Sequence, residues 1–208
     1  MSAPPAWRGQ AGGLLVVAQT PIRRRRSERC VGWLRQERLA AMSVMNPWVG
    51  GVVRPATPAD AAPIAACHNA CWRETFGDQF SARFWAAFDD ATRTRMWLRL
   101  LSRPGAHRVV VAEAGGRIVG FAAAGPSYDD LPARETELHA LYVTAVMHGT
   151  GVGQTLFDGV VAGRPCSLWV AEGNARALAF YRRQGFRPDG TRKTVTEWEG
   201  LVTIRMVR

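Results

Sequence analysis

The segment Leu141–Gln154, LYVTAVMHGTGVGQ, constrains the fold more than any other part of this chain. It passes from a strand-like run into a glycine-rich turn and then directly into an apolar helix. Gly149, Gly151 and Gly153 permit positive φ angles and carry no Cβ, so successive backbone N–H groups can point into one concavity at the positive end of a helix dipole. A pyrophosphate fits such a concavity. Because glycine at alternate positions also occurs in ordinary loops, the interpretation needs a second signal.

That second signal is the segment Trp169–Phe186, WVAEGNARALAFYRRQGF. Asn174 is a good N-cap for a helix that continues to about Gln184, with Gly185 as its end. Tyr181 follows Asn174 by two helical turns, so both side chains face the same way. The alternative is that Asn174 only caps the helix and Tyr181 only packs.

Together the two segments resemble the GNAT superfamily of acyl-CoA-dependent N-acetyltransferases in order, spacing and chemistry. The family's turn, Gln/Arg-x-x-Gly-x-Gly/Ala, corresponds here to His148, Gly149, Thr150, Gly151, Val152 and Gly153. One position departs from it, since His148 stands where the family has Gln or Arg. The second signature, Asn-x-x-Ala-x-x-Phe-Tyr-x-x-x-Gly-Phe, is met by Asn174, Ala177, Phe180, Tyr181, Gly185 and Phe186. The resemblance spans about residues 52–208.

The resemblance implies an α/β (α+β) fold with helices on both faces of a mixed, mostly antiparallel sheet, which is splayed at two central parallel strands. It implies acetyl-CoA as co-substrate and no metal. The pantetheine arm would pair with the backbone of Leu141, Tyr142 and Val143. The turn would hold the pyrophosphate, and the remaining cofactor contacts would come from Gln154, Asn174 and Tyr181. The implied reaction moves an acetyl group to a primary amine by direct attack in a ternary complex.

Amine acetylation needs a base, because an ammonium has no lone pair with which to attack. Glu137 is the first candidate and His139 the second, since strand alternation puts both on one face with Leu141. Glu137 also matches the place where some family members carry a catalytic glutamate, and an imidazole titrates near neutral pH. Tyr181 matches the family's general acid, which would protonate the leaving thiolate. The alternatives are that Glu137 and His139 only line a polar cleft and that Tyr181 only orients the thioester.

The coarse pattern from Gly51 onward alternates strands with helices. We expect strands near residues 52–54, 108–113, 117–124, 135–144, 167–171, 191–198 and 201–207. Helices are expected over about 57–75, 81–101, 152–161 and 175–184. Substrate choice should come from the first two helices and the closing hairpin, which contain aromatic and acidic residues that pack or reach the cleft: Trp72, Phe76, Phe84, Trp85, Trp97, Asp78, Asp89 and Asp90. If they reach the cleft, a cationic amine suits them.

Residues 1–47 stand apart from the acetyltransferase-like region, residues 48–208. They carry eight arginines against two glutamates, +6 of the chain's formal +10. With no sustained apolar periodicity, this part is expected to be a disordered extension, with a short helix around residues 31–42, and to be dispensable for folding. An alternative is a start site assigned too early, the natural product opening at Met42 or Met45. The arginine run 23–26 also fits an arm for nucleic acid or a membrane, whereas a secretory signal is excluded because the run follows the short apolar stretch.

Several function classes are excluded or weakened by composition. No stretch approaches the ~20 apolar residues that cross a bilayer, and Cys30, Cys67, Cys71 and Cys166 form no metal pattern. We expect a cytoplasmic enzyme with reduced thiols and a small-molecule or peptide amine as acceptor. We expect neither a membrane nor a nucleic acid as partner, and a homodimer is compatible with the sequence. The competing hypothesis is a basic nucleic-acid-binding or acyl-CoA-sensing protein with a non-catalytic fold of this kind.

Overall fold

The computed structural model describes residues 48–103, 105 and 107–208 of the 208. A single seven-stranded sheet runs through them in the order β1-β2-β3-β4-β5-β7-β6. Its strands are β1 Val52–Pro55, β2 Arg108–Ala114, β3 Arg117–Pro126, β4 Thr136–Val143, β5 Ser167–Ala171, β6 Arg187–Val195 and β7 Leu201–Val207. Every neighbouring pair is antiparallel except β4 with β5. The expected mixed, mostly antiparallel sheet is confirmed.

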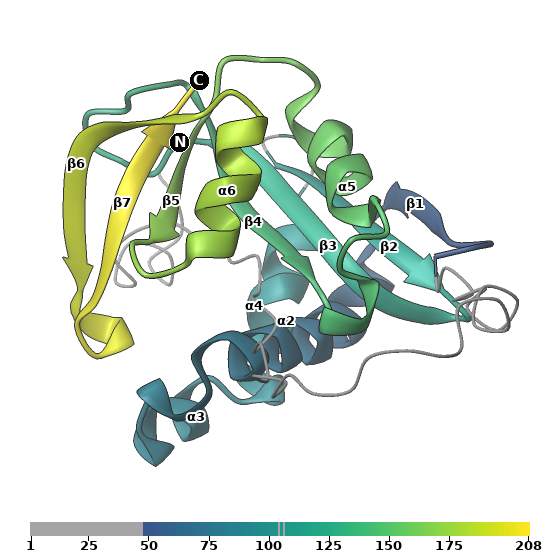
Figure 1. Ribbon diagram of the computed structural model, residues 1–208. Helices are drawn as coiled ribbons and strands as arrows, with labels where there is room; N and C mark the ends of the chain where they lie inside the picture. Colours follow the sequence, from purple (N-terminus) through teal and green to yellow (C-terminus); the bar gives the residue numbers. More distant parts are fainter. Residues whose placement is uncertain (1–47, 104, 106) are drawn as a thin grey trace, which may run out of the picture.

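Helices cover both faces of this sheet (Figure 1). The helices α2 Ala61–Phe76, α3 Ala82–Ala87 and α4 Asp90–Leu101 lie on one side, and α5 Val152–Val161 and α6 Ala175–Arg183 lie on the other. Four short 3-10 turns complete the order: η1 Pro58–Asp60, η2 Gly77–Gln79, η3 Ala145–Met147 and η4 Thr196–Trp198. Two hydrophobic clusters result, one between the sheet and α2/α4 and one between the sheet and α5/α6.

The helix expected over 81–101 is interrupted. It forms as α3 and α4, because Asp89 takes an extended backbone and accepts a hydrogen bond from the Thr92 amide at 2.7 Å, which starts a new helix. The strand expected over 191–198 begins earlier, at Arg187, and ends at Val195, where η4 leads into the turn at Glu199. The short helix expected around residues 31–42 lies outside the described residues.

The tip of the β6–β7 hairpin lies against the start of α3. Glu199 accepts a hydrogen bond from the Ser81 amide at 2.8 Å and a second one from the Ser81 hydroxyl. Trp198, just before the tip, packs edge-on against Trp72 of α2, with ring centroids 5.4 Å apart. The closing hairpin and the first helices therefore form one wall.

Aromatic packing dominates that wall. Trp72 and Phe84 stack with centroids 5.7 Å apart, and Trp97 is fully buried. Of the acidic residues expected near the acceptor, Asp89 caps α4 and Asp90 accepts from Asn69 at 2.6 Å. The aromatic residues are therefore chiefly core, which was one of the two expectations for them. Cys67, Cys71 and Cys166 are buried.

Candidate active site

The central parallel strands separate soon after they meet. β4 and β5 pair only at Glu137 with Ser167 and at Leu138 with Leu168. Beyond those pairs β4 runs on to Val143 and β5 to Ala171, so the facing edges of the strands diverge. α6 lies in front of this opening (Figure 1). Unpaired backbone N–H and C=O groups on a strand edge are a template for a peptide-like ligand.

A β-bulge in β4 changes which side chains share a face. In the pairing with β3, Ala123 opposes Ala140 and Ala124 opposes Leu138, so His139 is the extra residue. Leu138 and Leu141 consequently pack in the same cluster under α5 and α6, although they are three positions apart.

The expectation that Glu137 and His139 share a face with Leu141 is therefore wrong. Glu137 precedes Leu138 and so points to the opposite, α2/α4 side, where Ala140 and Tyr142 also pack. Strict alternation fails because the bulge adds one residue to β4, a feature that residue types alone did not signal.

Glu137 and His139 nevertheless lie together. Nδ1 of His139 is 3.4 Å from Oε1 of Glu137, and the two side chains are 3% and 1% exposed. The Ser127 hydroxyl donates to Oε2 of Glu137 at 2.7 Å. Burial raises the pKa of Glu137, but the His139 contact, the Ser127 hydrogen bond and the charge of Lys193 outweigh it, so the pKa lies below its usual value. Glu137 is thus a carboxylate at neutral pH.

The imidazole of His139 is buried, and neither ring nitrogen makes a hydrogen bond within the described part of the chain. Its ring stacks on Tyr128, with centroids 4.4 Å apart, and lies 5.5 Å from the ring of His107. His107 and Tyr128 are joined by a hydrogen bond of 2.6 Å. A buried imidazole that lies next to a carboxylate, and whose nitrogens make no hydrogen bond to the described residues, can accept a proton from a substrate.

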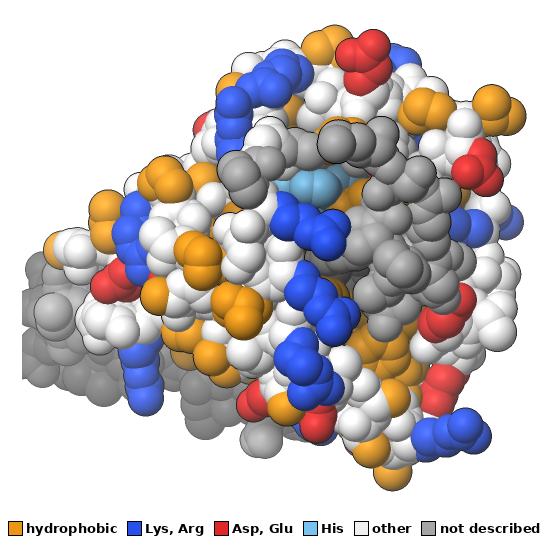
Figure 2. Space-filling view, turned by 180° about the vertical axis from the view of Figure 1, so that it is seen from behind, with side chains coloured by type: hydrophobic (Ala, Val, Ile, Leu, Met, Phe, Trp, Pro, Cys, Tyr) orange, Lys and Arg blue, Asp and Glu red, His pale blue; other side chains and the backbone are white. Residues whose placement is uncertain are grey.

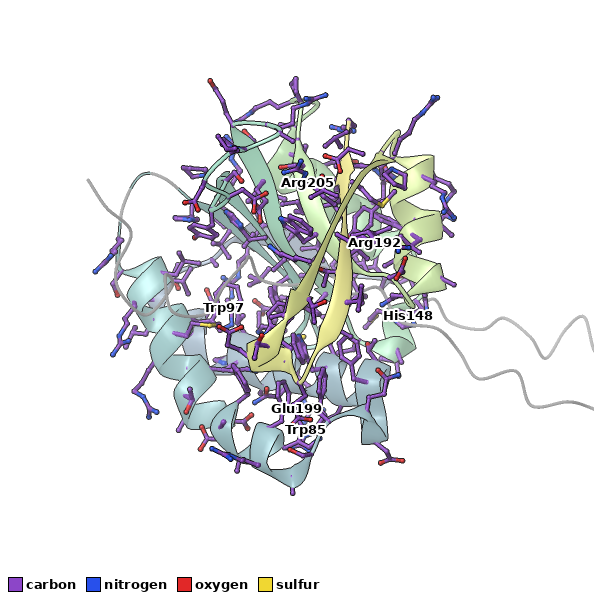
Figure 3. The ribbon with its side chains drawn as sticks, turned by 90° about the vertical axis from the view of Figure 1, so that its left-hand side faces the viewer. Trp85, Trp97, His148, Arg192, Glu199 and Arg205 are labelled. Atoms are coloured by element: carbon purple, nitrogen blue, oxygen red, sulfur yellow. The ribbon has the colours of Figure 1, made fainter. Side chains whose placement is uncertain are left out.

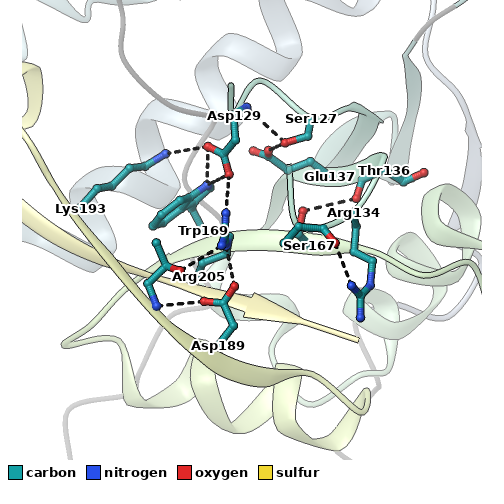
Figure 4. A network of polar contacts seen from close by, with 12 residues as sticks. Ser127, Asp129, Arg134, Thr136, Glu137, Ser167, Trp169, Asp189, Lys193 and Arg205 are labelled. Atoms are coloured by element: carbon teal, nitrogen blue, oxygen red, sulfur yellow. Dashed lines mark hydrogen bonds and ion pairs between the residues drawn. The ribbon is translucent and has the colours of Figure 1, made fainter. Parts of the chain in front are cut away.

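Figure 4 shows a second polar cluster beside Glu137 that sequence reasoning missed. Nζ of Lys193 lies 3.7 Å from the centroid of the Trp169 ring and 3.8 Å from Oδ1 of Asp129. Arg205 binds the other oxygen of Asp129 at 3.3 Å. These residues come from β5, β6, β7 and the loop after β3, so no local pattern in the sequence brings them together.

Tyr181, on α6, belongs to the hydrophobic cluster between the sheet and α5/α6. Its side chain is fully buried, and its hydroxyl has no hydrogen-bond partner among the residues that the structure describes. Burial raises the pKa of Tyr181 well above its usual value, and Tyr142 and Cys166 add to the effect. The phenol is therefore protonated at neutral pH. Unsatisfied buried hydroxyls are rare, so this one points to a ligand.

Asn174 behaves as the sequence predicted. Its Oδ1 accepts a hydrogen bond from the Ala177 amide at 3.0 Å, which caps α6. Its Nδ2 is buried and makes no hydrogen bond to the described residues. Capping therefore leaves one donor of Asn174 for another partner.

The glycine turn has the backbone that the sequence predicted at two of its three glycines. Gly149 has φ +79° and Gly151, the N-cap of α5, has φ +92°. Gly153 differs, because it already belongs to α5 and has no positive φ. A Cβ on Gly149 or Gly151 would meet no atom within 4 Å, so the space over the turn is open. The first amides of α5 have no partner within the helix and border that space.

A cavity of about 250 Å³ opens between this turn and α6. It brings together seven predicted residues: Leu141, Val143, His148, Gly149, Gly151, Gly153 and Gln154. Other predicted residues do not line it. Tyr142 is buried on the far face of β4, Val152 packs beneath the turn, and the Thr150 hydroxyl donates to the Met147 carbonyl at 2.7 Å.

Two arginines of α6, Arg176 and Arg183, also line the cavity. The sequence reasoning did not include them. Each lies on the same helix as Tyr181, at positions that the Asn174 signature leaves unspecified. Their relevance comes from their positive charge, which faces a turn suited to phosphate. That arrangement depends on how α6 packs against α5, so the sequence alone did not indicate it.

Among the residues described, no three His, Cys, Asp or Glu side chains lie close enough to hold a metal ion. Within the same residues, no helix combines the length and apolar character needed to cross a membrane.

Figure 2 shows basic side chains gathered in a column on the α2/α4 side of the molecule, with acidic ones mainly toward the margins.

Comparisons with known proteins agree with this geometry. Residues 64–186 match the acetyltransferase (GNAT) family. A protein of Mycobacterium tuberculosis named as a probable N-acetyltransferase is 28% identical over 162 residues, which cover 74% of this chain and 88% of the relative. An L-methionine sulfoximine/L-methionine sulfone acetyltransferase of Pseudomonas aeruginosa is 30% identical over 66% of this chain and 81% of its own length.

Solved structures show the same fold. The ribosomal-protein-alanine N-acetyltransferase of Brucella melitensis superposes with a TM-score of 0.58, 26% identity, and coverage of 76% of this chain and 98% of that one. The PaiA N-acetyltransferase of Thermoplasma acidophilum, solved with coenzyme A, gives a TM-score of 0.55 at 18% identity, covering 74% and 97%. The splayed sheet, the glycine turn and the family match agree, and this chain belongs to the GNAT family of acetyltransferases.

Proposed function

We propose that this protein is an N-acetyltransferase that moves an acetyl group from acetyl-CoA to a primary amine by direct attack in a ternary complex. The observation that carries the proposal is the buried hydroxyl of Tyr181, which has no hydrogen-bond partner among the described residues and comes from α6, the helix in front of the splay of β4 and β5. A donor whose pantetheine arm lies along β4 and whose phosphates lie over the glycine turn would bring its thioester toward that hydroxyl. The open space over Gly149 and Gly151 fits the phosphates.

The proposed proton acceptor is His139, with Glu137 behind it. Glu137 already accepts from Ser127 and has a pKa below its usual value, which makes its carboxylate a weak base. His139 has both nitrogens unpartnered within the described residues and lies 3.4 Å from Glu137, whose charge would stabilise the imidazolium that forms. This reverses the order in which the sequence ranked the two candidates.

Tyr181 would act at the other end of the reaction. When the tetrahedral intermediate collapses, the C–S bond breaks and the thiolate leaves with the electron pair. A phenol that stays protonated can donate to that sulfur.

The acceptor is proposed to be the amine of a small molecule or a peptide. One relative is named for L-methionine sulfoximine and L-methionine sulfone, and one structural neighbour is named for an alanine of a ribosomal protein. Both are amino-acid amines, so amino acids and peptide N-termini are the first compounds to test.

The experiment that tests the proposal is the release of free CoA thiol from acetyl-CoA in the presence of an amine panel. The panel should contain amino acids, L-methionine sulfone, polyamines and peptides that begin with alanine. The nucleic-acid-binding alternative depends on the arginines at 23–26, which lie outside the described residues. It predicts no thiol release and a salt-dependent affinity for nucleic acid that removal of residues 1–41 abolishes.

A further inference from the structure

His148, the one departure from the family's turn, is held in a defined state by two contacts. Its Nε2 lies 3.0 Å from the Val143 carbonyl oxygen, which can only accept, so Nε2 carries the proton. Nδ1 is then an acceptor, and it receives a hydrogen bond from Nη1 of Arg176. Burial and the charge of Arg176 lower the pKa of His148, so the ring is neutral at physiological pH. Figure 3 shows His148 at the turn, far from Arg205 on β7.

Arg176 faces the cavity without a balancing charge. It is half-buried, and no ion pair links it or Arg183 to a carboxylate in the described part of the chain. The nearby carboxylate of Asp158 is held by Gln154, at 3.0 and 3.1 Å. Burial, and then the like charge of Arg183, lower the pKa of Arg176. Two cations therefore face one hollow, which an anionic ligand would stabilise.

A purely structural role does not account for Arg176. It is the second residue of α6, and a cation in the first turn of a helix opposes the helix dipole. Its side chain instead crosses toward the turn at the start of α5, where the dipole favours an anion. Binding of an anionic ligand by the guanidinium would offset this unfavourable interaction with the dipole of α6.

We propose that Arg176, positioned by His148, is a phosphate ligand that supplies the guanidinium absent from position 148 of the turn. Arg183 adds positive charge at the exposed mouth of the same cavity. The ligand group is a diphosphate, bound between the amides of the turn on one side and the guanidinium on the other. This inference depends on the proposed function, since acetyl-CoA is the diphosphate-bearing donor that the cavity would take.

The first test is calorimetric titration of wild type and Arg176→Ala with acetyl-CoA and with inorganic pyrophosphate. The variant should bind both about tenfold or more weakly, as expected for losing a hydrogen bond to a charged group. Arg182→Ala is the matched control, because Arg182 is an exposed arginine of α6 that does not line the cavity. It should bind like wild type. His148→Leu, which removes the acceptor for Arg176, should weaken both ligands in the same way.

The second test separates phosphate binding from damage to the site. S-acetylpantetheine carries the thioester but no diphosphate, so Arg176→Ala should lower kcat/KM with this donor much less than it lowers kcat/KM with acetyl-CoA. Equal losses with both donors would show that the substitution disturbs the site as a whole and would overturn the inference.

The third test moves the guanidinium. His148→Arg placed in the Arg176→Ala background should restore most of the affinity for pyrophosphate, and failure to do so in a folded variant would refute the exchange of roles between positions 148 and 176. If wild type binds neither acetyl-CoA nor pyrophosphate, the proposed function itself fails. If wild type binds both and Arg176→Ala binds them equally well, only the inference about Arg176 fails.

Discussion

Nδ1 of His139 lies 3.4 Å from Oε1 of Glu137, and His139 is the extra residue of the bulge in β4. In a regular strand, two residues two positions apart point the same way but stay separated along the strand by about 6–7 Å. Because His139 is the extra residue of the bulge, this part of β4 departs from that regular geometry. The two side chains form a buried imidazole–carboxylate pair at the mouth of the splay.

The first prediction compares the two members of this pair. His139→Gln should lower kcat by roughly 10² to 10⁴-fold, because it removes the group proposed to take the proton from the amine. Glu137→Gln keeps the shape and should cost less, since it removes only the charge behind the imidazole. Steady-state kinetics at saturating acetyl-CoA check both. A larger loss in Glu137→Gln than in His139→Gln would make Glu137 the base instead.

Tyr181→Phe is expected to separate chemistry from binding. The substitution removes one oxygen that makes no hydrogen bond to any residue described, so the fold should be unaffected. Acetyl-CoA affinity should barely change while kcat falls roughly 10 to 10⁴-fold. Full kcat in the variant, with chemistry shown to be rate-limiting, would mean that the proton reaches the sulfur from water or from the departing ammonium.

Gly151→Val should weaken acetyl-CoA binding by about tenfold or more, about 1.4 kcal/mol. Gly151 has φ +92°, which valine adopts only with strain, and the added side chain would occupy the open space over the turn. Gly163→Val is the control, because Gly163 has φ +76° and equally open surroundings but does not line the cavity. Calorimetry should show a loss of affinity only for Gly151→Val, and similar losses in both variants would attribute the effect to backbone strain.

A fourth prediction concerns stability. Arg54 holds both oxygens of Asp60 at 2.8 Å, and the Thr57 amide donates to the same carboxylate at 2.8 Å. The hydrogen bond from Arg54 keeps the pKa of Asp60 below its usual value, although burial opposes the effect. Asp60→Asn should therefore cost about 1–2 kcal/mol at pH 7, at the low end because the Arg54 side chain is 35% exposed.

The sign of the pH dependence follows from the lowered pKa. The stabilisation is complete above the unfolded carboxyl pKa of about 3.9 and is lost as the pH falls below it. Thermal melts of wild type and Asp60→Asn should thus differ by a constant amount from about pH 7 down to pH 5 and converge in stronger acid. A difference that grows as the pH falls would contradict this account.

Much of the fold could be predicted from the sequence, because local signals agree with the final packing. Helix α5 and strand β5 occur where they were expected, over 152–161 and 167–171. Asn174 caps α6 as expected.

The side-chain directions at the site could not be predicted in the same way. The bulge at His139 depends on how β3 pairs with β4, and the approach of Arg176 to His148 depends on how α6 packs beside the turn. Both depend on contacts between residues far apart in the sequence, which local sequence patterns do not predict. Oligomeric state, cytoplasmic location and the role of residues 1–47 stay predictions.

The assay of CoA thiol release is the most direct test of the central claim. With saturating acetyl-CoA and the amine panel, wild-type protein should release thiol at a rate that depends on one class of amine, and mass spectrometry should find that amine 42 Da heavier, the mass of an added acetyl group replacing one hydrogen. Tyr181→Phe should release thiol at least about tenfold more slowly with the same amine. Thiol release that no amine accelerates, from folded protein that binds acetyl-CoA, would contradict the account.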